Sequence, residues 1–218
     1  MPAFEQWLYA QQELEGALGE ALYMSLISCE FSDKDAVWQL RNSLLEILSF
    51  DEKCKCQRIR DLNSIPMGGE ELADGKFFFE AVFDSLDEIA SYGPDKWWLS
   101  IYRCNQCDQN WMVAQEERIY DEFLFQRISA SEAQQALQGQ WPDTFWTYEK
   151  TLAVARKFTD APQFFDPMAY SLQSTVEGFL KERPEISNNE IANLLGLSAA
   201  HCAKLVQKVR QSKVNKLT

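Results

Sequence analysis

Two closely spaced cysteine pairs constrain the fold of this chain more than any other feature of its sequence. Cys104 and Cys107 enclose two residues in the stretch IYRCNQCDQNWMV, and Cys54 and Cys56 enclose one residue in DEKCKCQR. Apolar and aromatic residues flank the first pair on both sides, as expected for a tight turn between two strands. Such a turn, a zinc knuckle, directs two sulfur atoms at one metal ion. Because a structural zinc takes four tetrahedral ligands, we expect Cys54 and Cys56 to supply the other two.

Three other interpretations of the cysteines compete with a zinc site. A redox CxxC motif normally opens a helix after a strand, but here a strand is expected to follow and Asp108 lies next to the pair. A disulfide would be rare in a cytosolic protein. Unrelated buried thiols stay an open alternative, because CxC is a weak spacing for metal ligands. A site closed by four sulfurs has no position for a substrate, so we expect it to stabilise the fold and catalyse nothing.

Composition places the chain among ordinary globular proteins. Of its 218 residues, 46% are hydrophobic and 25% are charged. No apolar run is long enough for a membrane span. The initial stretch MPAFEQWLYAQQELEGALGE is acidic and has neither a basic start nor an apolar core, so no signal peptide is predicted. The expected location is the cytoplasm, where the six cysteines would be thiols or metal ligands.

Hydrophobic patterning predicts an α+β fold that is mainly helical, with a small antiparallel sheet carrying the knuckle. Residues 97–103 and 111–114 have the aromatic and β-branched composition of strands, and residues 120–128 form a third candidate. The two cysteines of the knuckle then lie between the first two strands.

The remaining segments are predicted to be helical or irregular. Apolar residues recur at helical spacing in four stretches, residues 3–29, 36–48, 131–138 and 144–158. Residues 77–90 are apolar on one face and acidic on the other, as in a solvated helix. Residues 63–76 are predicted to form a loop that can include a short helix. Two prolines in DAPQFFDP mark a boundary, so we expect an acidic α+β body over residues 1–160 and a helical segment over residues 161–218.

The C-terminal segment resembles a helix-turn-helix over the stretch NNEIANLLGLSAAHCAKL. Ser187 and Glu190 form a capping box at its start, and Gly196 falls in the turn, where a positive φ is often required. The apolar positions that would pack the two helices together are Ile191, Leu195, Leu197, Cys202 and Leu205. The motif can bind DNA or serve only in packing. Both alternatives stay open, because the first turn of the second helix offers no Arg, Asn or Gln for base contacts.

Charge is distributed unevenly along the chain. The net charge is −12, and residues 161–218 carry seven Lys/Arg and five Asp/Glu, so the first 160 residues carry −14. An acidic body repels nucleic acid and favours a basic partner, although solubility alone is an equal explanation. Acidic residues are dense between positions 70 and 95 and again at 116–122. The candidate contacts for a basic partner are Glu70, Glu71, Asp74, Asp84, Asp87, Glu88, Glu116 and Glu117.

No catalytic constellation is recognisable in the sequence. His201, the only histidine, lies within the C-terminal helix pair, so no histidine-based nucleophile system can be assembled. Neither a Gly-x-Ser-x-Gly motif nor a phosphate-binding glycine loop occurs. We therefore expect a non-catalytic binding protein.

The segment WLSIYRCNQCDQNWMVAQEERIYDEF resembles one found in small bacterial proteins with two cysteine half-sites, and Cys104, Cys107 and Trp111 carry the resemblance. Some of these proteins are similar to immunity proteins of interbacterial toxin systems. The resemblance covers residues 54–128 and departs at Asp108, where a glycine often follows the second cysteine. It implies a protein that binds and neutralises a cognate toxin, and the acidic body suggests that this toxin is basic.

The alternative function is a helix-turn-helix transcriptional regulator with a structural zinc site. From residue 199 to the end, the chain carries five Lys/Arg and no acidic residue. Lys204, Lys208 and Arg210 would then contact DNA phosphates, and the affinity for duplex DNA would depend strongly on salt.

Overall fold

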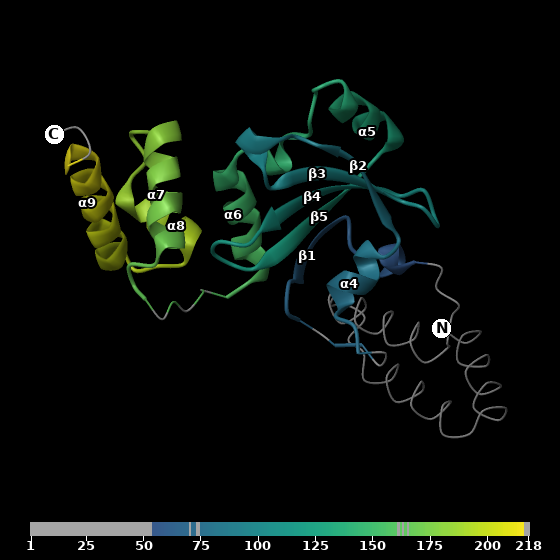
Figure 1. The fold of residues 1–218 in the computed structure, drawn as a ribbon, viewed down its shortest axis with the longest axis horizontal. Helices are drawn as coiled ribbons and strands as arrows, with labels where there is room; N and C mark the ends of the chain where they lie inside the picture. Colours follow the sequence, from purple (N-terminus) through teal and green to yellow (C-terminus); the bar gives the residue numbers. More distant parts are fainter. Residues whose placement is uncertain are drawn as a thin grey trace, which may run out of the picture. The chain divides into compact units, whose positions relative to one another are not determined.

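The computed structural model describes residues 54–69, 71–72, 75–160, 162, 164 and 166–215. The helices predicted at residues 3–29 and 36–48 lie outside this part of the chain. The described part contains five β-strands, three short 3-10 helices and six α-helices, which confirms the α+β class (Figure 1). None of these helices combines the length and hydropathy that crossing a bilayer would require.

Five antiparallel strands form one sheet, in the order β1-β5-β4-β3-β2. The strands are β1 (Leu62–Pro66), β2 (Leu86–Ser91), β3 (Leu99–Cys104), β4 (Asn110–Glu116) and β5 (Glu122–Ile128). The three predicted strands correspond to β3, β4 and β5, which follow one another as a meander. In their register, Trp111 of β4 lies opposite Tyr102 of β3 and opposite Arg127 of β5.

Apolar side chains cover both faces of the sheet. β4 is its middle strand, and nearly all side chains of β4 are buried. Because successive side chains point to opposite faces, Met112 and Ala114 join one core cluster, while Trp111 and Val113 join the other. Helices α5 to α9, between Ala130 and Asn215, contribute to the first cluster. Helix α4 (Phe78–Phe83) and the 3-10 helix η1 (Lys55–Arg58) contribute to the second. The sheet therefore separates two apolar layers.

The prediction of one amphipathic helix over residues 77–90 is wrong in its second half. Helix α4 (Phe78–Phe83) is only six residues long, and strand β2 follows it. Leu86 at the start of β2 lies opposite Cys104 at the end of β3. Pairing with β3, the next strand in the chain, satisfies backbone groups on one side of residues 86–91, so this strand pairing overrides the local helical pattern.

The loop predicted at residues 63–76 begins with a strand that the sequence pattern did not reveal. β1 is an edge strand and pairs with β5, so that Ser64 lies opposite Leu124. It contains Asn63 and ends at Pro66, two residue types that are rare in strands. Proline is accepted there because an edge strand leaves one row of backbone groups outside the ladder.

The helices predicted at residues 131–138 and 144–158 are confirmed, with shifted ends. The helices after α4 are η2 (Pro94–Lys96), α5 (Ala130–Leu137), η3 (Asp143–Phe145), α6 (Tyr148–Phe158), α7 (Tyr170–Glu182), α8 (Asn188–Leu195) and α9 (Ala199–Asn215). Ser129 and Glu132 form a capping box at the start of α5, and the Thr147 hydroxyl caps α6. Side-chain caps of this kind fix where a helix begins.

The expected local features of the C-terminal helix pair are present. The Ser187 hydroxyl accepts a hydrogen bond from the backbone N–H of Glu190, and the Glu190 carboxylate accepts one from the N–H of Ser187. Gly196 has a φ of 65° and joins α8 to α9. The side chains of Ile191, Leu195, Cys202 and Leu205 are buried, and that of Leu197 is partly buried. The two helices therefore pack through the predicted apolar positions.

One apolar cluster includes side chains from both sides of residue 160. Leu152 and Ala155 of α6 belong to the same cluster as Leu172 of α7 and Ile191 of α8. Helix α6 also contacts α8 directly. The domain boundary between residues 160 and 161 stays a prediction.

We predict that Gly196→Ala destabilises the protein by about 1 kcal/mol, since a Cβ atom disfavours the left-handed conformation. The N–H of Leu197 donates to the carbonyl of Ala192 at 2.9 Å and holds the turn in this conformation. Urea unfolding measures the effect. Asn193→Ala, an exposed change one turn earlier in α8, is the matched control and should change stability by less than about 0.5 kcal/mol. Equal stability of Gly196→Ala and wild type would contradict the prediction.

Candidate metal centre

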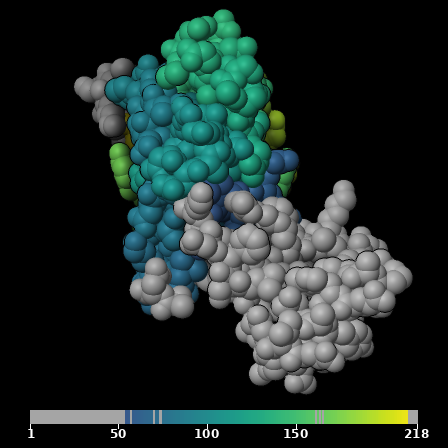
Figure 2. Space-filling model, turned by 90° about the vertical axis from the view of Figure 1, so that its right-hand side faces the viewer, coloured from purple at the N-terminus to yellow at the C-terminus, as the bar shows by residue number. Residues whose placement is uncertain are grey.

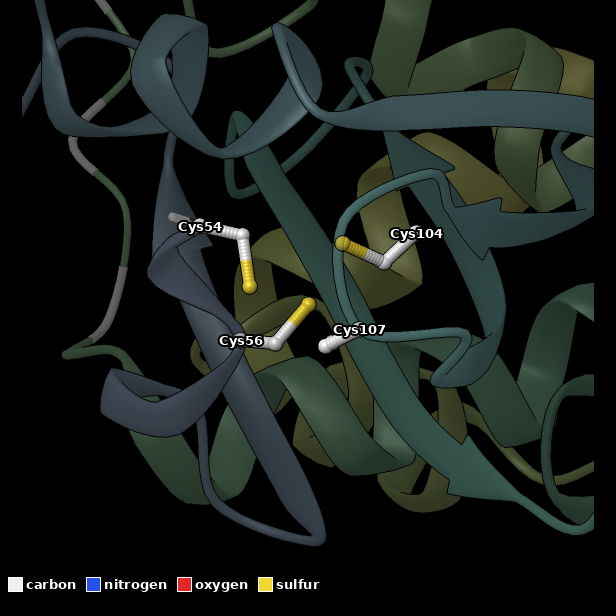
Figure 3. A group of neighbouring side chains, drawn as sticks. All are labelled: Cys54, Cys56, Cys104 and Cys107. Atoms are coloured by element: carbon white, nitrogen blue, oxygen red, sulfur yellow. The ribbon is translucent and has the colours of Figure 1, made fainter. Parts of the chain in front are cut away.

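Four cysteine side chains converge between η1 and the turn that joins β3 to β4 (Figure 3). Cys54 precedes η1 (Lys55–Arg58), Cys56 lies within it, Cys104 ends β3, and Cys107 lies in the turn. All four sulfur atoms lie within 4.8 Å of one another. Three of the cysteines are buried, Cys107 is exposed, and none forms a disulfide. The structure therefore brings together the four residues that the sequence predicts as metal ligands, in an arrangement compatible with a metal site.

The turn between β3 and β4 is held by its own backbone hydrogen bonds. The N–H of Cys104 donates to the Gln109 carbonyl at 2.8 Å, and the N–H of Asp108 donates to the Cys104 carbonyl at 3.0 Å. Asp108 has a φ of 61°, in the left-handed region that usually favours glycine. Aspartate is one of the few residues that tolerate this conformation, and its carboxylate also pairs with Arg103 at 2.6 Å. The turn thus keeps its conformation despite the departure from glycine.

Arg127 of β5 positions the other cysteine pair. Its guanidinium donates to the carbonyl oxygens of Cys56 at 3.3 Å and Ile59 at 3.2 Å. Cys56 lies within η1, and Ile59 directly follows it. It also lies over the ring of Trp111, 4.6 Å from the ring centroid. The sequence analysis missed Arg127, because only the strand register places it beside Trp111 and η1.

The indole of Trp111 contacts the cysteine cluster directly. Its Nε1–H donates to the Cys56 sulfur at 3.3 Å, and the Trp111 side chain is fully buried. An N–H donor stabilises a thiolate over a thiol, so this bond favours the form of Cys56 that binds a metal. The resemblance includes Trp111, but the sequence did not show which sulfur it would reach.

Without a metal ion, burial strongly favours the neutral thiols at two positions. It raises the pKa of Cys54 to about 11 and raises that of Cys56 further. Cys104 differs. Burial raises its pKa, but hydrogen bonds from the backbone N–H groups of Gln106 and Cys107 outweigh that effect and lower the pKa to about 7. Of these three thiols, Cys104 therefore loses its proton most easily.

The sequence predicts a strand, not a helix, after Cys107, and the structure has a strand there. Cys107 leads into β4, which begins at Asn110, so the pair does not open a helix. The helix N-terminus that activates the first thiol of a redox CxxC motif is thus missing from this turn.

Of the eight predicted acidic contact residues, two lie outside the described residues, five are exposed and one, Glu116, is buried. Glu70 and Asp74 lie outside the described residues. Asp84, at the end of α4, and Asp87 and Glu88, on β2, are exposed. Glu71 and Glu117 are exposed as well. The segment containing α4 and β2, coloured blue to teal, reaches the molecular surface in Figure 2.

Glu116 is not available to a partner, which corrects its assignment to the contact surface. Its side chain is fully buried. The carboxylate accepts hydrogen bonds from the backbone N–H groups of Ile119 at 3.0 Å and Tyr120 at 2.5 Å, and from the Tyr148 hydroxyl. The turn between β4 and β5 thus folds around Glu116. In sequence it is indistinguishable from its exposed neighbour Glu117.

The basic residues of the alternative function are accessible. Lys204, Lys208 and Arg210 are exposed on α9, while Cys202, Leu205, Val206 and Val209 face the core. The exposed side of α9 is therefore basic, as the sequence predicts.

Comparison with protein-family models, with curated proteins and with solved structures gives no match for this chain.

The buried carboxylate of Glu122 generates a pH-dependent prediction. Burial raises its pKa, although hydrogen bonds from the hydroxyls of Ser64 at 2.7 Å and Thr159 at 3.1 Å partly oppose the rise. A raised pKa in the folded state means that Glu122 favours folding below its unfolded pKa, and that this contribution is lost as pH rises through the folded-state pKa.

Glu122→Gln should therefore be more stable than wild type near neutral pH, and the difference should shrink toward acidic pH. Urea unfolding across this pH range measures it. Glu117→Gln, an exposed change in the same turn, is the control and should leave the pH profile unaltered. A Glu122→Gln protein that is no more stable than wild type at neutral pH would contradict the prediction.

Proposed function

We propose that one zinc ion joins the sulfurs of Cys54, Cys56, Cys104 and Cys107 and stabilises the fold. The donor set supports this metal, because four thiolates are a common ligand set of structural zinc sites. Zn–S bonds of about 2.3 Å in a tetrahedron place the sulfurs about 3.8 Å apart. Sulfurs already within 4.8 Å of one another need only small side-chain rotations to reach that geometry.

The zinc would fasten the two ends of the sheet together. Cys54 and Cys56 lie on the segment that leads into the edge strand β1, whereas Cys104 ends β3, the partner of the other edge strand β2. The N–H of Asn105 in the knuckle also donates to the carbonyl of Ser85, next to β2, at 2.9 Å. Binding of the metal therefore supports the conformation of the acidic strand.

We infer that β2 and the end of α4 form a binding surface for a basic protein. Asp84, Asp87 and Glu88 are exposed and lie within five residues of one another in sequence. β2 is an edge strand, so it pairs with β3 alone among the described strands. Acidic side chains on an edge oppose pairing with another acidic copy and attract a cationic partner, which speeds association.

The function best supported by this surface is that of an immunity protein, which binds and neutralises a basic cognate toxin without catalysis. The observation that carries the proposal is the acidic edge strand, whose residue Leu86 lies opposite Cys104 of the four-cysteine cluster. The resemblance of the knuckle segment to immunity proteins points the same way. We expect this role in the cytoplasm.

The second candidate is a DNA-binding regulator, and α9 supports it. Lys204 and Lys208 are one turn apart on the exposed side of α9, and Arg210 is exposed nearby. Each phosphate contact of this kind would make the affinity for DNA depend on salt. Neither candidate requires a catalytic residue.

We predict that Cys104→Ser removes zinc and lowers the free energy of unfolding by at least about 3 kcal/mol, since metal binding and folding are coupled in such sites. Elemental analysis of the purified protein and urea unfolding measure the two effects. Cys202→Ala alters a buried cysteine outside the cluster and is the matched control. It should keep one zinc per chain. A wild-type protein that holds no metal and folds normally would contradict the zinc proposal.

We further predict that reversing two charges, Asp87→Lys with Glu88→Lys, abolishes capture of the toxin. The tagged protein is used as bait in its own cells, with and without nuclease. Wild type should retain a basic protein in equal amount after nuclease treatment, and the double variant should not. Glu185→Lys, at an exposed position between α7 and α8, is the control and should capture as wild type does.

The captured protein must then arrest growth when it is produced alone, and growth must recover when the present protein is produced with it. Equal capture by the double variant, or a partner that never arrests growth, would contradict the immunity proposal. Captured DNA that disappears after nuclease treatment, or when the bait carries Lys204→Gln, would favour the regulator.

A further inference from the structure

Cys107 differs from the other members of the cysteine cluster in its accessibility. The other three side chains are at most 8% exposed, whereas Cys107, in the turn between β3 and β4, is exposed. Oxidants attack accessible thiolates before buried ones. An oxidant in the solvent therefore reaches one ligand of the proposed zinc ion before the others.

The cysteines at η1 are shielded from such an attack. The fully buried indole of Trp111 donates to the Cys56 sulfur at 3.3 Å, and a donor that stabilises a thiolate also lowers its nucleophilicity. Cys54, just before η1, is buried as well. Oxidation is thus expected to begin in the turn between β3 and β4 and not at η1.

Cys104 is placed to react with an oxidised Cys107, because both lie in the same turn. The N–H of Asp108 donates to the Cys104 carbonyl at 3.0 Å, which closes a single turn of chain, and the two sulfurs lie within 4.8 Å of each other. Such a turn keeps the Cα atoms of its first and fourth residues less than about 7 Å apart. Disulfides accept Cα separations in this range, so Cys104 and Cys107 can be joined without a change in the sheet.

We propose that hydrogen peroxide converts Cys104 and Cys107 to a disulfide and thereby releases the zinc, so that the cluster is a reversible redox switch. The inference rests on the zinc ion proposed above, but not on the identity of the partner. Cytosolic disulfides are usually transient ones of this kind. After the reaction only Cys54 and Cys56 stay available to the metal, and two thiolates do not complete a four-coordinate site.

The reaction takes two electrons from the two thiolates and gives them to the peroxide. The Cys107 thiolate attacks one peroxide oxygen, the O–O bond breaks and hydroxide leaves, which gives a sulfenic acid. The Cys104 thiolate then attacks the Cys107 sulfur, an S–S bond forms and a second hydroxide leaves. Two protons from the solvent convert both hydroxides to water. A dithiol reductant reverses the change by thiol–disulfide exchange.

The disulfide does not replace the link that the zinc provides. The zinc joins the segment at η1 to the turn between β3 and β4, because each supplies two of the four sulfurs. The disulfide connects only residues of one turn. Since metal binding contributes to folding in such sites, the oxidised protein should unfold at a lower urea concentration than the zinc-loaded protein.

Titration of the full-length protein with hydrogen peroxide tests the proposal, after zinc per chain has been measured in the reduced protein. A coloured zinc chelator reports release, and free thiols are counted in parallel. Each zinc released should accompany the loss of two thiols, and dithiothreitol with added zinc should restore both. Reduced protein without zinc would overturn the zinc proposal and the switch together. Zinc-loaded protein that keeps its metal and its thiols in excess peroxide would overturn the switch alone.

Digestion with trypsin, which cleaves after Lys and Arg, identifies the oxidised pair. Cys104 and Cys107 fall in one tryptic peptide, residues 104–118, whereas Cys54 and Cys56 fall in two others, residues 54–55 and 56–58. The expected product is the 104–118 peptide, lighter by two hydrogen atoms and linked to no other peptide. A disulfide between this peptide and residues 54–55 or 56–58 would overturn the assignment of the pair.

Cys107→His is the decisive variant, because histidine keeps a zinc ligand at this position and removes the accessible sulfur. It should hold one zinc per chain and release it at least about tenfold more slowly in peroxide, since only buried thiolates are left to react. Cys202→Ala, which alters a buried cysteine outside the cluster, is the control and should release zinc as wild type does. Release from Cys107→His at the wild-type rate would overturn the role of Cys107. The peptide map of wild type tests the same assignment without any variant.

Discussion

The convergence of four sulfur atoms within 4.8 Å is the constraint around which one layer of this structure is organised. It brings the segment before the edge strand β1 beside the turn after β3, which is the neighbour of the other edge strand, β2. The middle strands supply the supports between them. Trp111 donates to a sulfur, and Arg127 holds the carbonyl groups of η1. A zinc ion at this point would link both edges of the sheet through its centre.

The opposite charges of the chain are carried by different elements. Acidic side chains follow the edge strand β2, where they discourage pairing with another acidic strand and would attract the basic partner that we propose. Basic side chains follow the exposed side of α9. The two candidate functions therefore depend on different residues, and a charge reversal in one element separates them from each other.

Buried polar groups in this protein differ in whether the fold satisfies them. Glu116 accepts hydrogen bonds from the backbone of its own turn and from Tyr148, so it has a complete structural role. The Thr175 hydroxyl, buried beside a cavity, has no partner among the described residues. Buried polar side chains in the described part of the chain therefore contribute unequally to its stability, since an unpaired buried hydroxyl costs free energy.

The sequence by itself determined the α+β class, the strands beside Cys104 and Cys107, the capping of α8 at Ser187 and the four cysteines that meet. These depend on local patterns, such as alternation, capping pairs and ligand spacing. Only the tertiary structure decided that residues 86–91 form a strand, that Arg127 supports η1, and that Glu116 is buried while Glu117 is exposed. Each of these depends on contacts that exist only in the folded chain: β2 with β3, Arg127 with η1, and Glu116 with Tyr148 of α6. Such contacts can override local propensity, and no local pattern encodes them.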